Sequence, residues 1–188
     1  AAVRHRPDWI NVGEVRGEEA YVLFQALATG HGGLCTMHAE DAETAIKRLT
    51  QPPMNIPNTI IPLMNCVISV RHVKAPILVG YGRRRSKRKF VKVSEIVEAN
   101  SIHDVFVWDS STDDYVDDLL NSYLFAKIAE KWSLPVKYVY EEFERRKNVL
   151  QHLVEKNIRS YRNIAKFLIK FYNNPEAVYK EVVSHGGI

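Results

Sequence analysis

Acidic, basic and imidazole side chains follow two short apolar runs near the start of the chain. The first run, residues 9–12, is closed by a glycine and Glu14, with Arg16 two positions further on. The second run, residues 34–37, is followed by His38. Short apolar runs bounded by turn residues are typical of buried strands, and charged groups at strand ends suit the handling of phosphate, metal and water. Glu14, Arg16 and His38 are therefore the first candidates for chemistry.

Two helical patterns alternate with these runs and would hold them in place. In the first pattern, which should stop near Gly30, the apolar residues at helical spacing are Ala20, Leu23, Phe24 and Leu27. In the second, which begins with acidic residues, they are Ala42, Ala45, Ile46 and Leu49. The order strand, helix, strand, helix predicts an α/β fold.

The two motifs resemble those of a known family. Residues 4–19 resemble the Walker B region of the ATPases of type II secretion, type IV pili and archaella, and residues 29–39 resemble the histidine box of that family. Both occur in the family's order, and the resemblance extends over about residues 1–80. It implies a partial RecA-like P-loop NTPase sheet, in which the two motifs lie at the ends of adjacent strands.

The resemblance also implies roles for the candidate residues. Glu14 would bind Mg²⁺ through water or orient the attacking water, and Arg16 would brace the site. His38 would sense or hydrogen-bond the terminal phosphate of ATP. Arg4, Arg6 and His31 complete the set expected to contact the nucleotide, and the two arginines could instead meet an adjacent subunit.

Each assignment has a structural alternative. A Gly-Glu pair at a strand end is common in α/β proteins, and Arg16 could pair with Glu19 three residues on. Arg4 and Arg6 could simply be solvated. The set His31, Cys35, His38 and Cys66 suggests zinc, but its spacing fits no standard ligand pair, so the two cysteines are interpreted as buried strand residues.

The phosphate-binding loop of the family has no counterpart in the sequence. A Gly-x-x-x-x-Gly-Lys-Ser/Thr motif does not occur, and the chain contains no Gly-Lys dipeptide. We therefore expect the chain to be the C-terminal half of a longer ATPase. ATP and Mg²⁺ would bind the parent protein, whereas this part alone would hold neither tightly and would be inactive.

The rest of the chain changes from strands to helices. Strands are predicted at residues 66–73, 77–81, 90–97 and 106–108, as an extension that completes a first domain, residues 1–110. A helical appendage, residues 111–188, should follow. Its apolar faces are expected at Val116, Leu119, Leu120 and Tyr123, at Val136, Val139, Tyr140, Phe143, Leu150 and Leu153, and at Ile164, Phe167, Leu168 and Phe171, with helix starts at Ser160 and Asn174-Pro175.

Six of the seven residues 83–89 are basic, and they are interpreted as the tip of a β-hairpin. An alternative function is a nucleic-acid-binding module that uses this hairpin, and a third is contact with anionic lipid. Only Tyr81 and Phe90 flank the run, so base stacking is poorly provided for and nucleic acid is not the favoured partner. Acidic residues gather downstream, from Asp109 to Asp118, and the two clusters would face different partners or each other.

Composition sets the remaining expectations. The chain has 188 residues, 46% of them hydrophobic, which is enough for at least one core, and its formal net charge of +4 identifies no partner. No apolar run reaches the roughly 18 residues of a membrane span, and two cysteines suit a reducing compartment. These features predict a cytoplasmic protein. The resemblance implies that it is peripheral to the cytoplasmic membrane, forms a homo-hexamer and contacts an inner-membrane platform protein.

Overall fold

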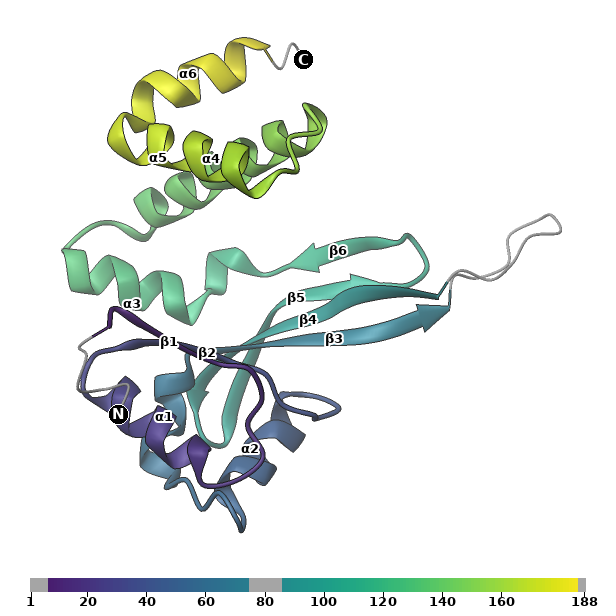
Figure 1. Ribbon diagram of the computed structural model, residues 1–188, viewed down its shortest axis with the longest axis vertical. Coiled ribbons are helices and arrows are strands. Elements are labelled where there is room, and N and C mark those ends of the chain that lie inside the picture. The colour runs from purple at the N-terminus through teal and green to yellow at the C-terminus, as the bar shows by residue number, and fades with distance from the viewer. Residues whose placement is uncertain (1–6, 75–85, 186–188) are drawn as a thin grey trace, which may run out of the picture. The chain divides into compact units, whose positions relative to one another are not determined.

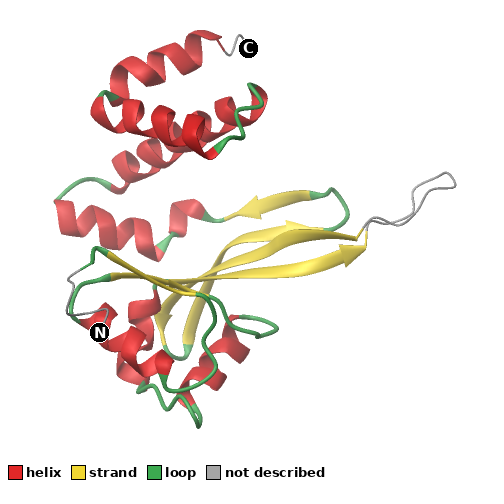
Figure 2. Ribbon diagram, in the orientation of Figure 1, coloured by secondary structure: helices red, strands yellow, loops and turns green. Residues whose placement is uncertain are grey.

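The computed structural model describes residues 7–74 and 86–185 of the chain, which divides into two compact units, Ala1–Leu124 and Phe125–Ile188. The first unit contains two sheets with helices, and the second is helical (Figures 1 and 2). The fold thus mixes helix and sheet, as an α/β prediction requires. Among the described residues, no helix is both long enough and apolar enough to cross a membrane.

The first elements alternate between strand and helix, as predicted: β1 (Trp9–Val12), α1 (Glu19–Ala28), β2 (Gly32–Cys35) and α2 (Ala42–Thr50). β1 and β2 pair in parallel, from Trp9 opposite Gly32 to Val12 opposite Cys35. A parallel pair needs a crossover connection, and α1 supplies it. The carboxyl ends of the two strands therefore lie side by side.

Helix α1 packs closely on β2. Its buried residues Leu23 and Phe24 follow the predicted spacing. A Cβ atom on Gly33 of β2 would lie 2.7 Å from a methyl carbon of Leu27, so a larger residue there would require the Leu27 side chain to move. The helix ends before Gly30, whose φ of 92° is a conformation that side chains disfavour.

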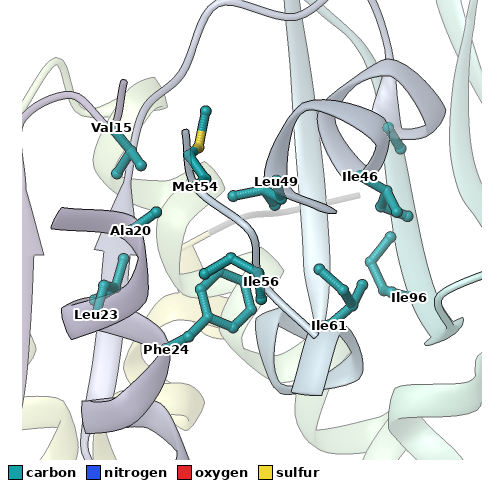
Figure 3. Close-up of a cluster of buried hydrophobic side chains, with 11 residues drawn as sticks. Val15, Ala20, Leu23, Phe24, Ile46, Leu49, Met54, Ile56, Ile61 and Ile96 are labelled. Atoms are coloured by element: carbon teal, nitrogen blue, oxygen red, sulfur yellow. The ribbon is translucent and has the colours of Figure 1, made fainter. Parts of the chain in front are cut away.

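One hydrophobic core joins the helices of the first unit to both of its sheets. It also includes the 3-10 helix η2 (Asn58–Met64), and Figure 3 shows its side chains gathered from α1, α2 and the segments that follow. The buried members are Val15, Ala20, Leu23, Phe24, Ala42, Ile46, Leu49, Met54, Ile56, Ile61 and Ile96. Because Ile96 comes from the second sheet and Val15 from the loop after β1, this core fixes the two sheets to each other.

The second sheet is antiparallel, with the strand order β3 (Cys66–Lys74), β4 (Ser86–Glu98), β5 (Ser101–Asp109) and β6 (Asp114–Asp117). The predicted strand 77–81 and residues 83–85 of the basic run lie outside the described residues. The remainder of the run was wrongly assigned to a hairpin tip. Arg88 and Lys89 belong to β4 and pair with His72 and Arg71 of β3, since the β-ladder continues through them.

The segment at 114–121 also differs from the prediction. Val116 lies in strand β6, opposite Val107 of β5, and Leu119 begins the short 3-10 helix η3 (Leu119–Asn121). The apolar spacing matched a helix, but pairing with β5 determines the conformation because it satisfies the backbone. The first α-helix after the second sheet is α3 (Tyr123–Trp132).

A buried carboxylate from the second sheet caps α3. Glu95 of β4 is 3% exposed. It accepts hydrogen bonds from the Ser122 hydroxyl at 2.6 Å and from the backbone amides of Tyr123 and Leu124 at 2.7 and 3.3 Å. The first amides of a helix lack intrahelical acceptors and carry a partial positive charge, so an anion there is stabilised.

The helical unit contains α4 (Val136–Glu155), α5 (Tyr161–Asn173) and α6 (Pro175–His185), with starts at Ser160 and Asn174-Pro175 as predicted. Its core cluster contains Val149, Phe171, Val178 and Val182. The prediction for Leu150 was wrong, since its side chain is 55% exposed whereas Val149 is 1% exposed. Val149 and Leu153 are one helical turn apart, and together they form the buried face.

Candidate functional site

The carboxyl ends of β1 and β2 are joined beyond the regular strand pairing. The Thr36 hydroxyl donates to the carbonyl of Gly13 at 2.5 Å, and the Val15 amide donates to the carbonyl of Thr36 at 2.9 Å. Val15 is itself buried in the core. These contacts fix the residues on either side of Val15 next to the segment that carries His38.

Glu14, Arg16 and His38 meet at this point, as the sequence predicts. The Arg16 Nε atom lies 2.7 Å from Glu14 Oε1, and the His38 Nε2 atom lies 3.2 Å from the same oxygen. That oxygen is covered from solvent, and its contact with the Arg16 guanidinium is an ion pair. The side chains of Arg16 and His38 are 73% and 83% exposed, so both remain accessible to a ligand.

The charges of this cluster reinforce one another. The Arg16 guanidinium, aided by His38, lowers the pKa of the Glu14 carboxyl, although partial burial opposes the change. Glu14 in turn raises the pKa of Arg16. Glu14 is therefore ionised at neutral pH. A carboxylate with a lowered pKa is a poor proton acceptor there, so it is better suited to hold a hydrated cation or orient water than to act as a general base.

A second carboxylate shapes the turn that carries Arg16. The Glu19 Oε1 atom accepts hydrogen bonds from the backbone amides of Arg16 at 2.5 Å and Gly17 at 2.8 Å. These amides lower the pKa of Glu19. The alternative pairing of the Arg16 side chain with Glu19 is wrong, because the guanidinium pairs with Glu14 while Glu19 bonds the backbone.

A cavity of about 170 Å³ opens beside the cluster. Its lining combines polar and apolar residues: Glu14, Val15, Arg16, Met37, His38, Arg48 and Met54. Two arginines, a histidine and one carboxylate leave this surface positive, which suits a phosphate group.

Arg48 was missed by the sequence analysis. Its guanidinium donates to the backbone carbonyl of His38 and thereby holds the loop between β2 and α2. A signal was present, because Arg48 lies seven residues after Asp41, two turns along the same side of the predicted helix. A long basic side chain there can reach back toward the loop that precedes the helix.

The other predicted residues are not at the cavity. His31 precedes β2, and its Nδ1 atom lies 3.1 Å from both the Ala26 carbonyl and the Thr29 hydroxyl, at the end of α1. A nucleotide contact by His31 stays a prediction. Arg4 and Arg6 lie outside the described residues.

The cysteines do not form a metal site with the histidines. Cys35 is exposed, and Cys66 is partly buried in the second sheet, so the interpretation of Cys35 as buried was wrong. Within residues 7–74 and 86–185, no group of three or more Cys, His, Asp and Glu side chains could hold a metal ion. For Mg²⁺, the cavity offers the single carboxylate of Glu14, which fits an ion that keeps most of its waters and is also held by phosphate.

Comparisons with known proteins found sequence relatives of this chain. The sequence profile of the family described as "Type II/IV secretion system protein" matches residues 1–100. The chain is 41% identical to the uncharacterized protein MJ1287 of Methanocaldococcus jannaschii over 162 residues, which is 81% of the chain and 56% of that protein. It is 32% identical to MJ0900 of the same organism, over 92% of the chain and 32% of that protein.

A third relative, matched over a shorter segment, is a protein of a type IV secretion system. The chain is 48% identical over 59 residues to the type IV secretion system protein PtlH of Bordetella pertussis, which is 31% of the chain and 17% of PtlH. The chain therefore spans about half the length of MJ1287 and smaller parts of the other two relatives.

Proposed function

The chain belongs to the type II/IV secretion system protein family, and we propose that it is the C-terminal portion of an ATPase that powers protein secretion or the assembly of a pilus or archaellum. The observation that carries this proposal is the meeting of Glu14, Arg16 and His38 at the ends of two parallel strands, beside a small positive cavity. In phosphoryl transfer, the protein mainly positions phosphate, metal and water, and this cluster contains the groups for that work.

The residues divide the work by charge. Glu14, ionised at neutral pH, would hold a water of the Mg²⁺ shell or orient the attacking water. When bound, ATP would supply the phosphoryl group that is transferred, and Mg²⁺ would neutralise part of the charge on its phosphates. Arg16 and His38 are the exposed positive and imidazole groups beside Glu14, and they would contact the terminal phosphate. Arg48 would keep His38 at this position by donating a hydrogen bond to the backbone carbonyl of His38.

The wider assembly is part of the same proposal. The parallel strands β1 and β2 would belong to a RecA-like sheet in the longer parent protein. That protein would form a homo-hexamer on the cytoplasmic side of the membrane and contact an inner-membrane platform protein, as family membership suggests. This chain alone would bind Mg²⁺–ATP weakly and turn over little, because it contains no Gly-Lys dipeptide for a phosphate-binding loop.

The test uses the longer parent protein with Glu14→Gln, which keeps the side-chain shape and removes the charge. We expect ATP hydrolysis to fall by about a hundredfold or more, while nucleotide affinity changes little, because the carboxylate acts mainly in the transition state. His38→Ala should slow hydrolysis by a smaller factor. Steady-state hydrolysis and equilibrium titration with a fluorescent ATP analogue measure the two effects separately.

Glu18→Gln is the matched control, since Glu18 is an exposed acid four residues along the chain from Glu14. It should leave both quantities unchanged. Hydrolysis by the Glu14→Gln protein at the parental rate would show that Glu14 is not the acidic residue of the site. Equal losses of hydrolysis and binding in Glu14→Gln would instead assign Glu14 to ground-state binding.

A further inference from the structure

The loop between β2 and α2, residues 36–41, carries His38 at the candidate site. The His38 side chain is 83% exposed, so packing does not fix the imidazole. Its place beside Glu14 therefore depends on the backbone that carries it. A loop backbone is held where its polar groups find partners, so the bonds made by this loop indicate what keeps His38 in position.

Three bonds come from elements next to the loop in sequence or in the parallel sheet. The Thr36 hydroxyl donates to a carbonyl of the segment after β1. Arg48 of α2 donates to the His38 carbonyl, and the Asp41 carboxylate accepts an amide of α2. These bonds hold the beginning, the middle and the end of the loop, but they do not involve Glu40.

Glu40 is held by the antiparallel sheet. The Arg71 Nη2 atom of β3 donates to the Glu40 carbonyl at 3.2 Å and lies 3.7 Å from the Glu40 Oε1 atom. The two residues are 31 positions apart in the sequence, so this is a tertiary contact. It joins the loop that carries His38 to a sheet that contains none of the residues predicted to contact the nucleotide.

The alternation of β3 explains why Arg71 reaches the loop. Side chains two residues apart lie on the same face of a strand. Val67 packs against the main core of the first unit, whereas Ile68 and Val70 are 54% and 52% exposed. Arg71 follows Val67 by four residues, so it lies on the core side of the strand, to which α2 also contributes buried residues.

The positive charge of Arg71 suits the acidic end of the loop. The Thr44 amide and hydroxyl lower the pKa of Asp41 most, and the charges of Arg71 and Lys92 lower it further. The Lys92 ammonium, however, forms its ion pair with Asp104 of β5. Of these two cations, Arg71 is therefore the one that contacts the loop directly.

We propose that Arg71 is a positioning residue for His38, which holds the loop from the antiparallel sheet so that the imidazole stays beside Glu14. Arg48 and Arg71 bond the carbonyls of residues 38 and 40, so the two guanidinium groups hold the loop from two different elements. The planar guanidinium of Arg71 reaches a carbonyl and a carboxylate together, which a lysine with its single nitrogen matches only in part. The consequence for hydrolysis rests on the proposed function, whereas the loop contact does not.

The first experiment tests the loop in this chain, without nucleotide. Nitrogen-15 relaxation of the His38 and Ala39 amides should give order parameters of about 0.85 in the parent, as in rigid backbone, and below about 0.6 in R71Q. R71K should lie between the two, because it keeps the charge but loses the planar fork. E40Q should stay close to the parent, because the carbonyl that Arg71 bonds belongs to the backbone.

R88Q is the matched control. Arg88 is an exposed arginine of β4 that donates to His72 Nε2 at 3.1 Å rather than to the loop, so R88Q removes the same charge from the same sheet. Its order parameters should equal those of the parent. Both variants should melt within about 2 °C of the parent, because they alter exposed side chains. Unchanged order parameters in R71Q, or equal falls in R71Q and R88Q, would refute the proposal.

The second experiment follows ATP hydrolysis by the longer parent protein. R71Q should lower kcat by about three- to tenfold, the factor that one hydrogen bond represents, with little change in nucleotide affinity. R71Q/H38A should hydrolyse ATP at the rate of H38A, because a residue that acts through His38 has no effect once the imidazole is gone. Losses that multiply in the double variant would refute positioning. A loosened loop with unchanged hydrolysis would support the proposal for Arg71 and count against the role of His38 in the proposed function.

Discussion

The two units of the chain bury their apolar residues to very different extents. Eleven buried residues form the main core of the first unit, whereas the main cluster of the helical unit has four. Several large apolar side chains of the helical unit are exposed, including Tyr161 at 84% and Val154 at 62%. The unit that carries the candidate site is therefore the one with the larger packed core.

The difference shows how stability is distributed. The core of the first unit joins α1, α2 and both sheets, and Val15 anchors the loop between Glu14 and Arg16 in it. The helical unit depends on fewer buried groups, aided by exposed ion pairs such as Arg145 with Glu176 at 2.6 Å. Exposed pairs add little, so we expect the helical unit to unfold first.

Phe24→Ala should have the largest effect. Phe24 is 2% exposed at the centre of the large core, so its removal should cost about 3–5 kcal/mol of unfolding free energy. Urea denaturation followed by circular dichroism measures this loss. Val22→Ala is the control on the same helix, because Val22 is 60% exposed. Similar losses for the two variants would contradict the packing shown in Figure 3.

Phe171→Ala should cost less, at the low end of the range for such changes, about 3 kcal/mol, since a thin core can collapse around the gap. Phe171 is 3% exposed. Hydrogen exchange should rise across α4, α5 and α6 and stay unchanged in α1 and α2, because the two core clusters share no residue. Ile169→Ala, at a 60% exposed position, is the control. An equal rise in α1 would mean that the units unfold together.

The smallest effects concern helix caps, which differ in charge between the units. The Asp41 carboxylate accepts the Thr44 amide at 2.8 Å in the first unit, and the Ser160 hydroxyl accepts the Asn163 amide at 3.3 Å in the second. Ser160→Ala should cost about 1 kcal/mol at any pH. Asp41→Ala should lower the melting temperature at neutral pH, with an effect that fades in acid.

The sign of the Asp41 effect follows from its pKa. The Thr44 amide lowers the pKa of Asp41 below the 3.8 of an unperturbed aspartate. Protonation of the folded state therefore requires more acid than protonation of the unfolded state, and the stabilisation is lost as the pH falls through the lowered pKa. Thermal melts of the parent and both variants over a series of acid to neutral pH values measure this. A constant Asp41→Ala deficit at every pH would show that the charge is irrelevant.

Much of the first unit could be predicted because local pattern and tertiary contact agree there. The spacing in α1 and α2 and the apolar runs of β1 and β2 each indicated the observed element, and parallel pairing then placed Glu14 beside His38. The sequence analysis was wrong where pairing with another strand determines the local conformation. β6, with two aspartates in four residues, has poor strand propensity and exists because it pairs with β5.

The candidate site shows the same limit. The types and order of Glu14, Arg16 and His38 carried their prediction. Arg48 acts through a backbone carbonyl, which leaves no mark in the types of neighbouring residues. Likewise, the pairing of Arg16 with Glu14 rather than Glu19 depends on the turn geometry that Glu19 itself stabilises.

Because Glu95 caps α3, the start of that helix does not depend on the length of the chain between β4 and α3. The Glu95 carboxylate and the Ser122 hydroxyl are 27 residues apart in sequence but 2.6 Å apart in space. Insertions or deletions in the turn between β5 and β6 can therefore accumulate without moving the start of α3. A slip of β4 by a single residue would do the opposite, since it would turn Glu95 to the other face of the sheet and remove the acceptor of the helix.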